Sequence, residues 1–210
     1  NETRAKLAGL NYDKSFTYSA SHATYYPGAV NMSIKILFEK ETGKLLGAQV
    51  VGYEGTDKRT DVLAMAIRAN MTIYDLTTLE LAYAPPFSSA KDPVNIAGYT
   101  AENILRGLSK NFHWDEVDSL PRDGSVTLLD IRTELEYELG NIEGFMNIPL
   151  DDLRNNLHRL PKGKPIYVLC QIGLRGHVAC RLLMQYGYDC YNLSGGYRLY
   201  ASINNKITNF

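Results

Sequence analysis

The sequence lacks any apolar run long enough to cross a lipid bilayer, and its first residues lack the pattern of a secretory signal peptide. These absences exclude an integral membrane protein built on helices and lead us to expect a cytoplasmic protein. The first residue is Asn1 rather than methionine. We therefore also expect the natural sequence to continue upstream.

The sequence also lacks an excess of charge of either sign. The chain holds 22 lysines and arginines against 23 aspartates and glutamates, which gives a net charge of -1. Because nucleic-acid surfaces gather lysine and arginine into patches, and no basic run stands out here, we expect no nucleic-acid partner.

Cysteine and histidine are few and scattered. The three cysteines are an odd count at wide spacings, which excludes a disulfide framework, and the four histidines show no ligand spacing. We therefore predict no metal site. Cys180 falls inside a helical pattern and Cys190 inside an apolar strand pattern, so both are interpreted as packing residues, which leaves Cys170 for chemistry.

The first half of the chain reads as strands followed by helices. Residues 1–10 are polar and are predicted to be a connection. Period-two patterns predict strands over residues 16–20, 30–38 and 45–53. Helical spacing predicts helices over 60–70, with a cap at Thr60-Asp61, over 75–81 and over 93–105. This order predicts an α+β domain with an antiparallel sheet.

The second half alternates the two kinds of pattern. Strands are predicted over residues 126–131, 145–148, 166–169 and 189–193, with helices after 133, 151, 175 and 196. This alternation predicts an α/β domain with a mainly parallel sheet. Thr133 and Glu136 predict a capping box, and Gly195-Gly196 after the last strand predicts a close approach of backbone beside the site. At 210 residues the chain can hold two cores, and a polar stretch suggests the boundaries 1–108, linker 109–113 and 114–210.

Cys170 is predicted to lie at the carboxyl end of a buried strand, where a loop opens directly onto a helix. Helix N-termini present free N–H groups and a positive dipole, and Arg175 adds a cation. We therefore expect a lowered thiol pKa and a loop that holds an anion. The residues expected to hold it are Gln171, Ile172, Gly173, Leu174, Arg175 and Gly176.

Two other interpretations of this loop remain open. Cys170 could be an ordinary buried cysteine at a strand end. A cysteine phosphatase would instead need five residues between its nucleophile and its arginine, but four separate Cys170 from Arg175, and the next position is Gly176. The shorter loop favours a smaller ligand, such as one extra sulfur atom.

The second half resembles a single-domain rhodanese from about Trp114 to Tyr200. The resemblance rests on the motifs Leu128-Leu129-Asp130-Ile131-Arg132-Thr133 with Glu136-Tyr137, Gly140-Asn141-Ile142-Glu143-Gly144, Cys170-Gln171-Ile172-Gly173-Leu174-Arg175 and Asn192-Leu193-Ser194-Gly195-Gly196-Tyr197. Asn141 stands where the family usually has histidine. The resemblance implies a sulfurtransferase that carries sulfane sulfur as a persulfide on Cys170, with Arg175 as a second catalytic residue; Asp130 and Arg132 are expected to form a supporting ion pair.

The first half resembles the dimerisation domain of pyridine-nucleotide disulfide oxidoreductases, in the coenzyme A-disulfide reductase branch. The motifs are Ser21-His22-Ala23-Thr24-Tyr25-Tyr26-Pro27-Gly28 and Leu81-Ala82-Tyr83-Ala84-Pro85-Pro86. The resemblance implies a homodimer through residues 1–108, in which Tyr25 and Tyr83 reach the partner's active site as catalytic residues. Tyr26 remains an alternative to Tyr25. A phenol beside a disulfide can donate a proton to a leaving thiolate.

No G-x-G-x-x-G fingerprint follows any predicted strand. The resemblance implies FAD, NAD(P)H and coenzyme A for a longer enzyme whose nucleotide-binding half is absent from this sequence, and no cofactor is expected on this part alone. Coenzyme A and small sulfur compounds are the implied acceptor and donors. The alternative is a non-catalytic dimerisation or docking module on a rhodanese scaffold.

Overall fold

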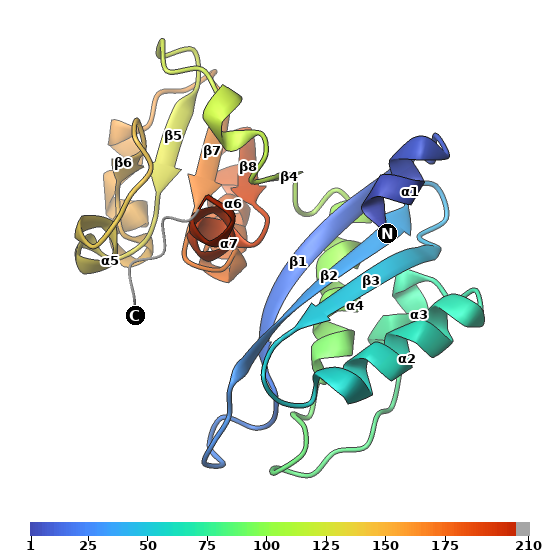
Figure 1. The fold of residues 1–210 in the computed structure, drawn as a ribbon. Helices are drawn as coiled ribbons and strands as arrows, with labels where there is room; N and C mark the ends of the chain where they lie inside the picture. Colours follow the sequence, from blue (N-terminus) through green and yellow to red (C-terminus); the bar gives the residue numbers. More distant parts are fainter. Residues whose placement is uncertain (205–210) are drawn as a thin grey trace. The chain divides into compact units, whose positions relative to one another are not determined.

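The fold comes from a computed structural model, which describes residues 1–204. The chain divides into two compact units, Asn1–Arg106 and Gly107–Phe210. Each unit has its own sheet (Figure 1). The predicted fold classes are confirmed: an antiparallel sheet with helices comes first and a parallel α/β sheet second.

The first unit is a three-stranded antiparallel sheet covered by helices on one face. Its elements are α1 Glu2–Leu7, β1 Tyr12–Ala20, β2 Asn31–Glu39, β3 Leu45–Val51, α2 Thr56–Arg68, α3 Ile73–Thr78 and α4 Pro93–Leu105. In the central strand β2, Met32, Ile34, Ile36 and Phe38 point into the core, where they meet apolar residues of α2, α3 and α4 (Figure 1). The alternating pattern of β2 therefore fixes the face that α2, α3 and α4 cover, whereas Glu2 of α1 contacts Lys35 on the other face.

Several boundaries in this unit differ from the predictions; β1, for example, begins at Tyr12 rather than at residue 16. Residues 1–10 include helix α1, which Asn1 caps by accepting from the N–H of Arg4. Helix α2 begins at Thr56, because Gly55 starts it in a left-handed conformation (φ 65°) without a side-chain cap. Helix α3 begins at Ile73, after a capping box formed by Thr72 and Asp75.

The second unit is a five-stranded parallel sheet in the order β4-β8-β7-β5-β6. Its elements are β4 Asn111–Phe112, η1 Val117–Ser119, β5 Thr127–Asp130, α5 Glu134–Glu138, β6 Met146–Asn147, η2 Leu150–Arg159, β7 Ile166–Leu169, α6 Leu174–Gln185, β8 Cys190–Leu193 and α7 Gly196–Ile203. The predicted linker 109–113 contains β4, which pairs with β8, so these residues belong to the second unit. The helix predicted after residue 151 is a 3-10 helix.

The central strands of this sheet are buried on both faces. Ile166 and Val168 of β7 pack with residues of α6 and η2, whereas Leu169 packs with residues of α7 and η1. β5 divides in the same way, with Leu129 in the first cluster and Leu128 in the second. This division explains why the strands read as continuous apolar runs, and it places the carboxyl end of β7 in the centre of the unit.

Candidate sulfur-binding site around Cys170

Cys170 follows β7 directly, and the loop from Gln171 to Gly173 leads into α6. Gly173 precedes the helix in a left-handed conformation (φ 98°), which glycine adopts without strain. Its N–H donates to Cys170 Sγ over 3.1 Å. The N–H groups of Ile172 and Gly176 lie near enough to this sulfur to lower the pKa of the thiol. Three amides therefore converge on Sγ, as the strand-loop-helix pattern predicts.

The predicted lowering of the Cys170 pKa is wrong in this structure. Burial raises the pKa of the Cys170 thiol, while the amides of Gly176, Ile172 and Gly173 and the charge of Arg175 lower it, and burial prevails. The residue is 0% exposed. A sequence pattern shows the donors around a thiol but not how completely the fold removes water from it.

Arg175 does not direct its guanidinium to the sulfur. Its Nη1 and Nη2 donate to the two carboxylate oxygens of Glu136 over 2.8 and 2.6 Å. The ion pair with Arg175 lowers the pKa of Glu136 to about 2 and raises the pKa of Arg175. From the sequence, Glu136 is recognisable only as a helix-capping residue. Its capping position close after the end of β5 is the sequence feature that could have placed it near the cysteine loop.

Asp130 and Arg132 form the predicted ion pair at the carboxyl end of β5. Arg132 Nη2 lies 2.7 Å from Asp130 Oδ2, and both side chains are almost fully buried. The guanidinium also donates to the main-chain oxygens of Glu136 and Gly140 and lies 4.0 Å from the centre of the Tyr197 ring. Burial raises the pKa of Asp130 and Arg132 opposes the rise. The pair thus ties β5, α5 and α7 together beneath the loop.

Of the remaining predicted loop residues, some contact neighbouring elements and one is exposed to solvent. Gln171 Oε1 lies 3.5 Å from Arg132 Nη1, and the side chain of Leu174 is 66% exposed. At Gly176, an added Cβ would lie 2.1 Å from Asn192 Oδ1. Glycine is therefore required where α6 approaches both β8 and the sulfur.

The turn at Gly195 and Gly196 brings α7 against the cysteine loop. The N–H of Tyr197 donates to the main-chain oxygen of Cys170 over 2.8 Å, and that of Arg198 donates to the oxygen of Gln171 over 2.9 Å. Gly196 has φ 63°, and an added Cβ would lie 2.5 Å from the Cys170 oxygen and 2.6 Å from the Ile172 nitrogen. The backbone approach predicted for this pair of glycines is present.

We predict that Gly196→Ala lowers the free energy of unfolding of the second unit by about 1–3 kcal/mol, because the new methyl group overlaps loop backbone that cannot move freely. The matched control is Gly163→Ala, since Gly163 also has positive φ (77°) but has no atom within 4 Å of an added Cβ. Denaturant unfolding followed by the fluorescence of Trp114 measures both, because Trp114 is the single tryptophan and packs in the second unit. Equal losses in the two variants would contradict the prediction.

Tyr25 and Tyr83, 58 positions apart in the sequence, meet through their hydroxyl groups, which lie 2.8 Å apart. Their side chains are exposed by 74% and 49%. The hydrogen bond that Tyr25 shares with Tyr83 raises the pKa of Tyr25. Tyr26 instead directs its ring edge-on to His22. The structure thus brings together the two predicted tyrosines on the surface of the first unit.

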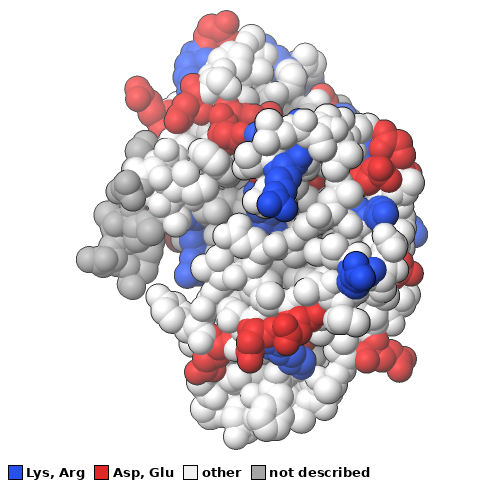
Figure 2. All heavy atoms as spheres, turned by 45° about the vertical axis from the view of Figure 1, so that its right-hand side comes forward, with Lys and Arg blue, Asp and Glu red and all other residues white. Residues whose placement is uncertain are grey.

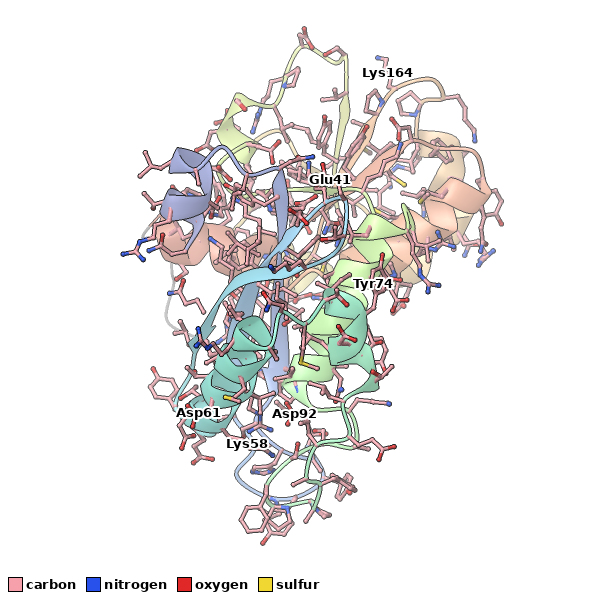
Figure 3. The ribbon with its side chains drawn as sticks, turned by 90° about the vertical axis from the view of Figure 1, so that its right-hand side faces the viewer. Glu41, Lys58, Asp61, Tyr74, Asp92 and Lys164 are labelled. Carbon is pink, nitrogen blue, oxygen red and sulfur yellow. The ribbon has the colours of Figure 1, made fainter. Side chains whose placement is uncertain are left out.

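Arg59 of α2 bonds to the two loops that carry Tyr25 and Tyr83. The sequence alone did not identify this role of Arg59. Its Nη2 donates to Asp92 Oδ2 over 2.8 Å, to the main-chain oxygen of Ser21 over 2.9 Å and to Ser88 Oγ over 3.2 Å. Arg59 is 1% exposed and Asp92 2%. Figure 3 labels Asp92 together with Lys58 of the same helix, whose Nζ lies 3.8 Å from Asp92 Oδ2. No local pattern distinguishes Arg59 from an exposed helical arginine.

Other features of residues 1–204 add no second reactive centre. Cys180 and Cys190 are buried in the second unit, and the Cys190 thiol donates to the main-chain oxygen of Cys180. These residues contain no group of three or more His, Cys, Asp or Glu side chains arranged to hold a metal, and no helix among them is long and apolar enough to span a membrane. On the face shown in Figure 2, basic and acidic side chains are interspersed.

Comparisons with known families match both units. The pyridine nucleotide-disulphide oxidoreductase dimerisation domain matches residues 1–93, and the rhodanese-like domain matches residues 113–202. The chain therefore combines a dimerisation domain of this oxidoreductase family with a rhodanese-like domain.

Solved structures show the same two domains in one chain. The reduced CoADR-RHD of Bacillus anthracis is similar with a TM-score of 0.95 and 47% identity, over 98% of this chain and 37% of that chain. A NAD-dependent persulfide reductase from A. fulgidus is similar with a TM-score of 0.83 and 38% identity, over 95% of this chain and 36% of that chain. This chain is thus similar to the dimerisation and rhodanese part of such two-domain chains, as its motifs predict.

Curated relatives agree with this assignment. The coenzyme A disulfide reductase of Staphylococcus epidermidis is 45% identical over 97 residues, which are 46% of this chain and 22% of that protein. That of Staphylococcus haemolyticus is 43% identical over 99 residues, again 22% of the relative. The chain therefore spans about a fifth of the length of these relatives.

Proposed function

We propose that the second unit is a sulfurtransferase that carries sulfane sulfur as a persulfide on Cys170. The observation that supports it best is the convergence of three backbone N–H groups, from Ile172, Gly173 and Gly176, on one sulfur atom. Such a cradle stabilises negative charge on a thiolate and on a sulfur bound to it.

The reaction takes place in two displacements. The Cys170 thiolate attacks the outer sulfur of a donor R–S–S⁻; a new S–S bond forms, the donor's own S–S bond breaks, and R–S⁻ leaves with the electron pair. An acceptor thiolate then attacks the outer sulfur of the Cys170 persulfide, and the Cys170 thiolate leaves. Because burial raises the pKa of the thiol, its proton has to leave before the first step, and the departing R–S⁻ takes up a proton and leaves as R–SH. The loop amides and the field of Arg175 favour the Cys170 thiolate.

The test is exposure of the full chain to inorganic polysulfide, followed by mass spectrometry of its peptides. We expect an adduct of one sulfur atom, about 32 Da, on the Cys170 peptide, because this thiol has the anion-stabilising amides. Cys170→Ser should abolish the adduct, whereas Cys180→Ser and Cys190→Ser should retain it. An equal adduct on wild type and Cys170→Ser would refute the proposal.

Two other candidates account for less of the structure. A phosphatase needs an arginine at the position of Gly176, where an added Cβ already meets Asn192; hydrolysis of an aryl phosphate would revive it. A non-catalytic docking module does not explain why backbone amides of the loop gather around the sulfur of Cys170. The polysulfide experiment separates it from the sulfurtransferase, because a scaffold alone takes up no sulfur.

We propose for the first unit a homodimer through residues 1–108, in which Tyr25 and Tyr83 serve the partner subunit's redox site. The support is their shared hydrogen bond on an exposed surface. With their hydroxyls joined, one tyrosine can donate a proton to a leaving thiolate while the other stabilises the resulting phenolate. Analytical ultracentrifugation of this chain tests the dimer, and a monomer at micromolar concentration would contradict it.

We propose for the longer protein the reduction of coenzyme A disulfide or persulfides, the activities in the names of the relatives, in the cytoplasm. The family implies FAD and NAD(P)H. The residues of this chain do not fit a dinucleotide: its strand-to-helix loops lack the fingerprint G-x-G-x-x-G, and the loop after β7 closes its amides around Sγ. FAD and NAD(P)H are therefore assigned to residues outside this sequence, and the acceptor of sulfur from Cys170 is coenzyme A or a redox cysteine of the reductase part.

A further inference from the structure

The ion pair between Glu136 and Arg175 joins helix α5 to the cysteine loop. Both guanidinium Nη atoms donate to the carboxylate, and the two side chains remain 29% and 34% exposed. Arg175 is thus close to solvent and within the electrostatic reach of Cys170, but its charge is matched by a carboxylate.

Local hydrogen bonds hold Glu136 in this position. Its Oε2 also accepts from the N–H of Thr133 over 2.9 Å and from Thr133 Oγ1 over 3.1 Å. The carboxylate therefore completes the capping box of α5 and binds Arg175 with the same oxygen. A side chain fixed by its own helix start stays beside Arg175 when a donor arrives.

The charged groups closest to the loop therefore cancel. Asp130 neutralises Arg132 beneath the loop, and Glu136 neutralises Arg175 at its edge. Beside these two ion pairs, the amides around Sγ and the start of α6 supply positive potential at the sulfur. These partial charges act on one bound sulfur atom and decline within a turn, so they do not attract a donor of high negative charge from a distance.

We propose that Glu136 determines the donor class of this sulfurtransferase: it cancels the attraction of Arg175 for anionic donors, so that persulfides on neutral or cationic carriers react in preference to thiosulfate. This inference rests on the sulfurtransferase function proposed above. With thiosulfate, Cys170 would take the outer sulfur while sulfite leaves with the electron pair. With a persulfide R–S–S⁻ the leaving group is R–S⁻, and only the charge of R differs between carriers.

The experiment compares donors that differ in charge. The probes are thiosulfate and two persulfides of similar size, 2-aminoethyl persulfide and 2-carboxyethyl persulfide. The measured quantity is the second-order rate constant for sulfur addition to Cys170. Mass spectrometry of the full chain, after quenching at successive times, gives this constant. In Glu136→Gln, the rates with thiosulfate and 2-carboxyethyl persulfide should rise roughly tenfold relative to 2-aminoethyl persulfide. Glutamine retains the oxygen acceptor that Thr133 needs.

Three further measurements distinguish charge from structure. Glu138→Gln, an equal change on the exposed part of α5, should leave the donor ratios unchanged. Added salt should reduce the gain in Glu136→Gln, since screening weakens attraction to the released guanidinium. Arg175→Met in the Glu136→Gln background should return the ratios toward wild type.

The outcomes separate this inference from the function on which it rests. If the wild type takes up sulfur but Glu136→Gln has the same donor ratios, with Trp114 fluorescence showing a folded variant, the proposed role of Glu136 is overturned. The sulfurtransferase function would stand in that case. Absence of sulfur addition to wild type from every donor would overturn the sulfurtransferase function itself.

Discussion

Replacing Arg132 with methionine is expected to lower the free energy of unfolding of the second unit by about 3–5 kcal/mol, because the substitution leaves the carboxylate of Asp130 buried without its partner. Asp130 is 0% exposed and at present accepts from Arg132 at both oxygens. Denaturant unfolding followed by Trp114 fluorescence measures the loss. A decrease below about 1 kcal/mol would show that the buried pair contributes little to stability.

A matched control is Arg159→Met, which removes the same charge from an exposed position at the end of η2. Surface substitutions of this kind change stability by about 0.5 kcal/mol or less. The double variant Asp130→Leu/Arg132→Met should recover part of the loss, since removing both charges avoids an unpaired buried ion. Recovery would assign the cost to the stranded carboxylate rather than to the lost contacts with Gly140 and Tyr197.

Much of the second unit could be predicted from the sequence because its strands are short, apolar and bounded by turn residues. β7 matches its predicted range, Ile166–Leu169, and the capping box of Thr133 and Glu136 is present. The tight approach at Gly196 was also predictable, because paired glycines after a strand allow backbone contact.

The missed boundaries have a common cause in non-local or weak local signals. Helix α1 is short and polar, and Glu2 bonds to Lys14 and contacts Lys35 on the neighbouring strands. Those partners lie 12 and 33 residues away, beyond any local pattern. Helix α2 begins after a glycine without a capping side chain, so the expected cap at Thr60 was misplaced.

The sequence predicts which groups surround Cys170, but it does not predict the direction of the thiol pKa or the partner of Arg175. The loop amides follow from a strand, a short loop and a helix start. The raised pKa of Cys170 depends on how the fold buries the sulfur, and the pairing of Arg175 with Glu136 joins residues 39 positions apart. Tertiary packing therefore decided the direction of the thiol pKa and the orientation of the guanidinium, while local sequence decided where the amides lie.

The first unit depends on a second buried arginine, and its loss should affect both stability and the tyrosine pair. Arg59→Met is expected to lower the free energy of unfolding of this unit by about 3–5 kcal/mol, because Asp92 would keep a buried charge without its closest cation. Arg68→Met, on an exposed position of the same helix, is the control. Far-UV circular dichroism in denaturant follows both units, and the transition that Trp114 fluorescence does not share belongs to the first.

Arg59 bonds to Ser21 and Ser88, at the bases of the loops that carry Tyr25 and Tyr83, so the same variant should also loosen these loops. The N–H of Ala23, which donates to the oxygen of Ser88 over 3.1 Å, is a direct probe of the contact between the loops. We expect its hydrogen exchange to accelerate in Arg59→Met and to stay slow in Arg68→Met. If Arg59→Met lost stability but kept slow exchange at Ala23, the arginine would stabilise the unit without positioning the tyrosines. Faster exchange there, while the other amides of a folded first unit stay slow, would instead show that Arg59 holds the two loops that carry the phenols.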